Sequence, residues 1–118
     1  MATKAEIERY LPLKPAYFHI LLCLTEKPTH GYGVRQEIEE RTAGRIVLAA
    51  GTLYEALQRL ERDALVEETA APAEAAERAS SRWRFYRATR LGRAVVRAEI
   101  ERLEADVSAA RAALGRTS

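Results

Sequence analysis

The spacing of apolar residues along this 118-residue chain predicts a series of helices. Residues 3–10 are polar helix formers that predict a short leading helix, which the prolines in residues 11–15 bring to an end. Residues 16–26 are apolar on nearly every side, as is typical of a central buried helix. Residues 32–42 are apolar on one face only, so they predict an amphipathic helix that stops at Ala43-Gly44.

A further amphipathic helix is predicted over residues 51–63, and its start signal is the clearest in the chain. Thr52 and Glu55 have the spacing of a capping box, in which each side chain accepts a hydrogen bond from the backbone N–H of the other residue. Apolar residues then repeat at helical spacing and are candidate core residues: Leu53, Ala56, Leu57 and Leu60.

Three short segments have the composition of strands. Residues 45–48 are short and β-branched, residues 65–69 are a second candidate, and residues 82–89 are rich in aromatic side chains. Because the last two follow a helix and are joined by a polar segment, they predict a β-hairpin, or wing. The joining segment, residues 70–81, suits either an irregular loop or a helical turn, and the sequence leaves both open.

The final helix is predicted to begin at a Thr89 cap and to reach Leu114. Its apolar residues lie alternately four and three positions apart, which is the pattern of a coiled-coil seam. Leaving them in water would forfeit about 1.5–3 kcal/mol each, so we expect them to pair with a second copy of the chain. The alternative is that the stripe folds back onto its own domain. The candidate dimerisation residues are Val96, Ile100, Leu103, Val107, Ala110 and Leu114.

The predicted fold class is mainly α with a small β-hairpin (α+β), in the order of a winged helix-turn-helix followed by a long C-terminal helix. Residues 1–89 would form the DNA-binding domain and residues 90–118 the dimerisation helix. In such a fold the helix over residues 51–63 would enter the major groove of double-stranded DNA. Winged helices also serve as protein-interaction modules, and a small-molecule-binding protein without DNA contact is a further alternative.

Composition and charge narrow these possibilities. The chain is 47% hydrophobic and 31% charged, which excludes a disordered chain and argues against a membrane protein. The net charge of +2 permits nucleic acid as a partner without requiring it. Between residues 78 and 93 no acid interrupts the basic residues, which could grip phosphates or could simply form a solvated face: Arg78, Arg82, Arg84, Arg87, Arg90 and Arg93.

The exposed face of the predicted groove-reading helix supplies the candidate base contacts. Gln58 suits adenine and Arg59 suits guanine, whereas Glu55 is explained by capping alone. The hydroxyl of Tyr54 could reach a phosphate, and the alternative is that its ring packs against the preceding helix.

No catalytic or metal site is expected, and no cofactor. His19 falls in the buried helix, and His30 stands where a residue that starts a helix is expected. The single cysteine, Cys23, should be an inert buried thiol, and one Cys with two His at unrelated spacings makes no zinc site. The N-terminus is polar and the longest apolar run, residues 20–24, is too short for a membrane span, so we expect a cytoplasmic protein.

Several separate motifs, in their family order, resemble the PadR family of bacterial transcriptional regulators. The resemblance covers roughly residues 11–114. The matching stretches are Leu13-Lys14-Pro15 through His19-Ile20-Leu21, His30-Gly31-Tyr32-Gly33, Gly51-Thr52-Leu53-Tyr54 with Leu57 and Arg59-Leu60-Glu61, Arg84-Phe85-Tyr86-Arg87 with Thr89, and Leu91-Gly92-Arg93.

This resemblance implies a homodimer held by the C-terminal helix, which represses transcription on a palindromic operator and is often released by a small-molecule effector. It implies DNA contacts at Lys14, Tyr32, Thr52, Tyr54 and the wing base Arg82–Arg84. Two departures stand out. Ala50 replaces a proline that commonly precedes Gly-Thr-Leu-Tyr, and the last helix has no tryptophan of the kind that stacks planar drugs, since the sole Trp83 lies in the hairpin.

Overall fold

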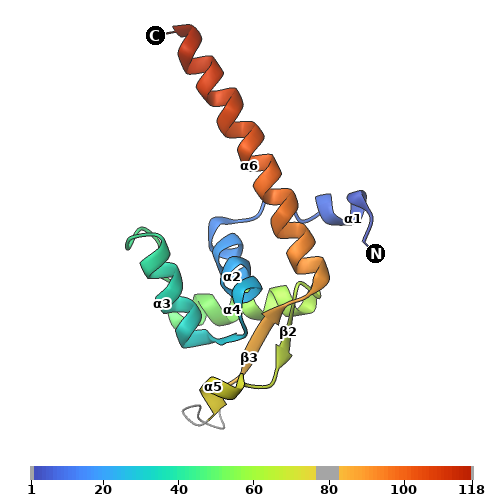
Figure 1. Ribbon diagram of the computed structural model, residues 1–118, viewed down its shortest axis with the longest axis vertical. Coiled ribbons are helices and arrows are strands. Elements are labelled where there is room, and N and C mark those ends of the chain that lie inside the picture. The colour runs from blue at the N-terminus through green and yellow to red at the C-terminus, as the bar shows by residue number, and fades with distance from the viewer. Residues whose placement is uncertain (1, 77–82, 118) are drawn as a thin grey trace.

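A computed structural model describes residues 2–76 and 83–117. Helices form one side of the body, a small sheet lies at the other, and one long helix projects from it (Figure 1). The elements are α1 (Lys4–Glu8), α2 (Pro15–Glu26), β1 (Thr29–His30), α3 (Gly31–Arg41), α4 (Ala50–Arg62), β2 (Val66–Thr69), α5 (Ala73–Ala76), β3 (Phe85–Ala88) and α6 (Arg90–Thr117).

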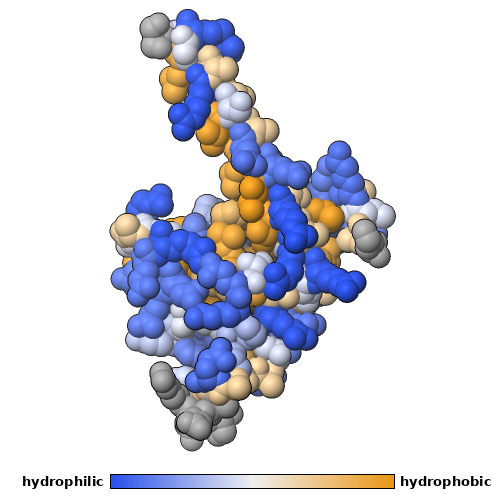
Figure 2. Space-filling model, viewed as in Figure 1, coloured by the Kyte–Doolittle hydropathy of each residue, from blue (hydrophilic) through white to orange (hydrophobic). Residues whose placement is uncertain are grey.

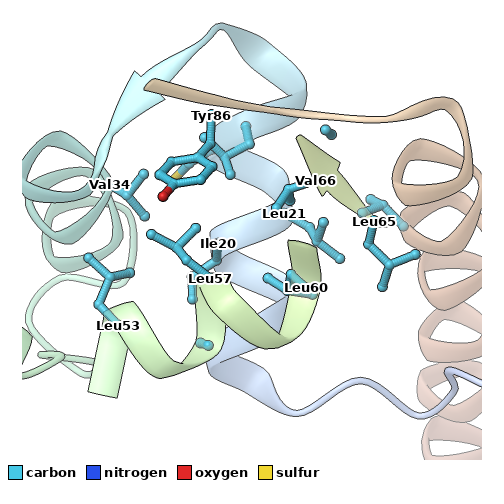
Figure 3. Close-up of a cluster of buried hydrophobic side chains, with 14 of the residues drawn as sticks. Ile20, Leu21, Val34, Leu53, Leu57, Leu60, Leu65, Val66 and Tyr86 are labelled. Carbon is cyan, nitrogen blue, oxygen red and sulfur yellow. The ribbon is translucent and has the colours of Figure 1, made fainter. Parts of the chain in front are cut away.

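The core is built around α2, whose nearly uniform apolar surface is covered on several sides. Ile20 and Leu21 of α2 meet the apolar stripe of α4 and the first residues of β2, as Figure 3 shows. The predicted core of α4 is confirmed, because all four of its candidate residues are buried: Leu53, Ala56, Leu57 and Leu60. Burying these side chains holds α4 against the body and leaves its opposite face exposed.

The predicted hairpin is confirmed, and a third strand joins it. β2 and β3 pair antiparallel with Val66 opposite Ala88, and β3 also pairs with β1 in the sheet order β1-β3-β2. In the joining segment, α5 supports the helical-turn alternative for residues 73–76. This arrangement of helices, sheet and long C-terminal helix confirms the predicted fold class.

The strand predicted over residues 45–48 is wrong. These residues form an irregular segment in which Ile46 N–H donates to Thr42 Oγ1 (3.1 Å) and Arg35 Nε donates to the Leu48 carbonyl (2.8 Å). The third strand is instead β1, which lies directly before α3. A β-branched composition favours strands, but a strand also needs a neighbour, and residues 45–48 do not join either edge of the described sheet.

The predicted capping box at Thr52 is also wrong. The N-cap of α4 lies three residues earlier, at Ala49, which is extended and provides no side-chain cap. Thr52 therefore lies inside the first turn, where it caps nothing. The packing of the apolar stripe stabilises this helix without a side-chain cap, and its first backbone hydrogen bond runs from the Leu53 N–H to the Ala49 carbonyl (3.0 Å).

The cap predicted for the last helix is confirmed. Thr89 Oγ1 accepts from the Gly92 N–H (3.0 Å), and α6 runs on past Leu114 to Thr117. The first turns of α6 pack on the body, with Val95 and Val96 buried, and the rest projects beyond it (Figure 1). Within residues 2–76 and 83–117, none of the helices has the length and apolar content needed to span a bilayer.

Candidate nucleic-acid interface

The outer face of α4 is a continuous exposed surface. Thr52, Gln58 and Arg59 are exposed, and the Tyr54 side chain keeps 51% of its surface accessible. The Tyr54 ring nevertheless packs against the preceding helix, which was one of the two alternatives for this residue. It lies so close to Gly31 that a Cβ added there would be 3.1 Å from the Tyr54 hydroxyl oxygen. The ring and its hydroxyl thus rest on the backbone at the start of α3, while the residue as a whole stays half-exposed.

A groove of about 370 Å³ separates α4 from the base of the hairpin. It brings together four of the predicted contact residues, Tyr32, Tyr54, Gln58 and Arg84. Five further residues line it, none of which was predicted to contact DNA: His30, Gly31, Glu61, Trp83 and Tyr86. Of these, Glu61 could have been found from sequence, because it follows Gln58 by three positions and so shares its helical face.

The other predicted contact residues lie elsewhere. Lys14 is at the N-terminal end of α2, where its Nζ lies 5.9 Å from the centre of the Tyr17 ring, and it does not line the groove. Thr52 and Arg59 are exposed on α4 outside the groove lining. Arg82, like Arg78, falls outside the described residues.

The basic stretch of the hairpin is less cationic in space than in sequence. β2 supplies acids opposite the arginines of β3: Arg87 Nε lies 2.8 Å from Glu67 Oε2, and Arg84 Nε lies 3.7 Å from Glu68 Oε1. On α4, Arg59 is 3.5 Å from Asp63. Exposed pairs of this kind contribute only about 0–1 kcal/mol, so a phosphate can displace the carboxylate at little cost.

His30 joins the start of α3 to the hairpin. As predicted, it starts a helix: its Nδ1 accepts from the Gly33 N–H (3.1 Å) at the N-cap of α3. Its ring lies 4.3 Å from the Trp83 ring and meets the Phe85 ring edge to face at 5.2 Å. Burial lowers the pKa of His30 below its ordinary value of 6.5, so the neutral ring that can accept this hydrogen bond is favoured.

We expect the stability of the protein to fall as the pH drops below about 6.5. Below that pH the unfolded chain binds a proton at His30 while the folded chain, with its lowered pKa, does not, so unfolding becomes more favourable. The variant His30→Asn keeps a side-chain acceptor at the N-cap but does not titrate. Thermal unfolding between pH 5 and 8 should therefore show a flatter profile for His30→Asn, and an unchanged profile would contradict this role.

Burial also shifts the pKa of two side chains in α2, His19 and Cys23. His19 is half-buried, and burial together with Arg41 and Arg45 lowers its pKa. Burial raises the pKa of the Cys23 thiol to about 12, with a further contribution from Glu37, so the thiol stays protonated. In the part of the chain that the structure describes, no cluster of three His, Cys, Asp or Glu side chains could hold a metal ion.

Known proteins resemble this chain in sequence. The family model described as the transcriptional regulator PadR-like family matches residues 20–98. An uncharacterized protein from Lysinibacillus sphaericus is 35% identical over 75 residues, which is 64% of this chain and 65% of that protein. The chain thus matches just under two thirds of the length of this relative.

Solved structures agree with the fold. A PadR family transcription regulator from Clostridium difficile superposes with a TM-score of 0.70 at 22% identity, over 86% of this chain and 99% of that one. A transcriptional regulator from Clostridium thermocellum gives a TM-score of 0.67 at 22% identity, over 94% and 96% of the two chains. At these identities the likeness shows a shared fold.

Proposed function

This chain belongs to the PadR-like family of transcriptional regulators, and from that premise we propose that it is a homodimeric repressor that binds a palindromic DNA operator. It is a regulator and not an enzyme. In this proposal the outer face of α4 reads the bases in the major groove, the base of the wing grips the backbone, and α6 joins two copies. Residues 1–89 form the DNA-binding part and residues 90–118 the dimerisation helix.

The observation that carries the DNA proposal is the groove between α4 and the hairpin. Tyr32, Tyr54, Gln58 and Arg84 all line this groove, and all four residues are exposed. Hydroxyl and guanidinium groups bind phosphate, and an amide can form two hydrogen bonds to an adenine edge. An exposed helix with the wing beside it suits a groove about 12 Å wide, and Arg84 and Arg87 of the wing can exchange their carboxylate partners for phosphates at little cost.

Salt dependence of binding to duplex DNA tests this proposal. A dimer that neutralises about 6–10 phosphates should give a slope near −5 to −9 when log K is plotted against log salt concentration. The operator itself is best found by selecting bound sequences from random duplexes, which also reveals two-fold symmetry and half-site spacing. No duplex binding at low salt would reject DNA as the partner and favour a protein-interaction module on the same fold.

Gln58 is expected to contribute base preference. Gln58→Ala should cost about 1–3 kcal/mol on the selected operator and much less on random DNA, because a lost base contact weakens only the specific complex. The control is Glu39→Ala, which truncates a side chain on the exposed face of α3, outside the groove, and should leave the ratio of operator to random-DNA affinity unchanged. Equal losses on operator and random DNA, measured by fluorescence anisotropy, would show that Gln58 does not read a base.

The exposed part of α6 supports the dimer. The apolar side chains of Ile100, Leu103 and Val107 are 40%, 37% and 50% exposed, and Figure 2 shows apolar surface along the projecting helix. Ala110 and Leu114 are also exposed. Val96 differs, because it is buried in the core of its own chain and is not available to a second copy. The dimerisation seam therefore begins at Ile100 in this proposal.

Repression and its relief by a small-molecule effector complete the proposal. A dimer that covers an operator would block transcription by occupancy, and an effector would act by changing the angle between the two halves. A drug-stacking site between paired tryptophans is not part of it, since α6 contains none and Trp83 lies beside His30. Transcription in vitro from a promoter that carries the selected operator tests repression: activation by the protein would contradict it.

A further inference from the structure

Glu99 marks the point at which α6 leaves the body of the protein. The buried residues of α6 are Gly92, Val95, Val96 and Glu99, and every residue from Leu103 to Thr117 is exposed. Glu99 itself is only 1% exposed. A fully buried carboxylate at the last buried position of a projecting helix is a feature that neither core packing nor an apolar seam requires.

Both oxygens of this carboxylate are hydrogen-bonded. Oε2 accepts from the Leu13 N–H at 2.6 Å, which ties α6 to the segment between α1 and α2, 86 positions away in sequence. Oε1 accepts from Arg102 Nε at 2.5 Å, and the same guanidinium also donates to Asp106 Oδ2 at 3.0 Å. Arg102 thus fixes the side chain of Glu99 from its own helix, while Leu13 connects it to the body.

A second fixed contact lies seven residues earlier on nearly the same face. A Cβ added at Gly92 would lie only 2.1 Å from the Leu65 carbonyl oxygen, so the backbone of α6 rests directly on Leu65, the residue before β2. Seven residues make almost two turns, about 10 Å along the helix axis. Two fixed contacts on one face, at Gly92 and Glu99, define the direction of the helix relative to the body.

The chemistry of Glu99 favours a directional role over a stabilising one. Burial alone raises the pKa of this carboxyl, but the bonds from Arg102 and Leu13 outweigh it, so the pKa is lowered and the group stays ionised. An apolar residue of similar volume is often as stabilising as a buried ion pair, whereas only the ion pair prescribes geometry. Val95 and Val96, the other buried contacts of α6, are apolar and non-directional.

Because α6 continues far beyond Glu99, a small change in its direction displaces its C-terminal end by a large distance. From Glu99 to Thr117 the helix extends about 27 Å at about 1.5 Å per residue. A change of about 10° in its direction would move the far end by about 5 Å, which exceeds the rise of about 3.4 Å per base pair along DNA. In a dimer joined through α6, the direction of this helix therefore decides how far apart the two α4 helices lie.

We propose that Glu99, through its bonds to the Leu13 N–H and Arg102, is the positioning residue that sets the direction of α6 and thereby the half-site spacing that the dimer reads. The spacing part rests on the proposed function, whereas the direction of α6 can be measured without DNA.

The test compares Glu99→Leu with wild type on operators whose half-site spacing is varied by one base pair at a time. Wild type should prefer one spacing by about tenfold or more over a spacing altered by two base pairs, and Glu99→Leu should reduce this ratio below about threefold. Glu101→Leu is the matched control, because it makes the same change at an exposed position of α6 and should keep the wild-type ratio.

Measurements on the free protein separate the two parts of the proposal. Amide exchange at Leu13 should accelerate in Glu99→Leu, and residual dipolar couplings should show an altered or broadened direction of α6. If Glu99→Leu does not fold, Glu99→Gln keeps one acceptor and should give an intermediate spacing ratio. Should wild type show no spacing preference, the proposed function fails while the dipolar couplings still decide the direction of α6.

Two outcomes overturn the role of Glu99. The first is a folded, dimeric Glu99→Leu protein with the wild-type direction of α6 and the wild-type spacing preference. The second is an equal loss of spacing preference in Glu101→Leu, which would show that any change on this helix has the same effect.

Discussion

Leu103→Asp is expected to separate the proposed dimer and to weaken its binding to the proposed operator by about 10²–10⁴-fold, the factor by which joining two sites commonly raises affinity. Leu103 is 37% exposed on the seam of α6, between Ile100 and Val107. In a symmetric pair the substitution removes two leucines, worth about 1.5–3 kcal/mol each, and introduces two carboxylates into the same contact. The dissociation constant of the dimer should therefore rise by about a thousandfold or more.

Ala105→Asp provides the control for this experiment. Position 105 is exposed and lies two residues after Leu103, which places it on the opposite side of the helix. It carries the same new charge without touching the seam, so sedimentation velocity should show an intact dimer. A Leu103→Asp protein that sediments as a dimer at micromolar concentration would refute the seam, whatever its affinity for DNA.

Gly92→Ala is expected to destabilise the folded chain by about 2–3 kcal/mol, even though alanine in a helix is favoured by about 1 kcal/mol over glycine. The added Cβ would lie 2.1 Å from the Leu65 carbonyl oxygen, which is backbone and cannot turn aside. This same oxygen accepts from the Thr89 N–H (3.0 Å), so it is held on both sides. α6 would have to move outward and lose its packing at Val95 and Val96.

The result should be a fall in Tm on the order of 10 °C, measured by circular dichroism. Gly115→Ala is the matched control, since it lies in the same helix with no atom within 4 Å of an added Cβ. It should be neutral or slightly stabilising. If Gly92→Ala and Gly115→Ala have the same Tm, the short distance between Gly92 and Leu65 does not exclude a side chain at position 92.

Local patterns predicted the helices of this chain well. The apolar stripe of α4, the turn at Gly44 and the caps at His30 and Thr89 all appear where the residues indicated. Each of these features depends on residues a few positions apart, such as the hydroxyl of Thr89 and the N–H of Gly92. Periodicity is a property of one segment, so the sequence of that segment is sufficient to reveal it, whereas the failed capping box at Thr52 shows that a local start signal alone does not decide where a helix begins.

Features that join distant segments could not be predicted in this way. Residues 45–48 do not form the expected strand. The third strand is β1, whose pairing with Phe85 and Tyr86 joins residues more than fifty positions apart. The uninterrupted basic stretch of the hairpin meets Glu67 and Glu68 only because β2 pairs with β3 in this register. Pairing depends on which neighbour is free in the folded chain, and composition alone does not specify that.

In the candidate site and the C-terminal helix, too, features of a single segment could be predicted and features that join distant segments could not. The helical period alone indicated that α4 has an exposed polar face and that α6 carries an apolar stripe from Val96 to Leu114. The packing of distant segments was needed to show that Val96 is buried in its own chain while Ile100 and Leu103 are exposed. It was also needed to show that Glu61 and Trp83 join Gln58 around one groove. The physical reason is that a helical period fixes which side chains share a face, whereas the packing of other segments decides where along that face burial ends.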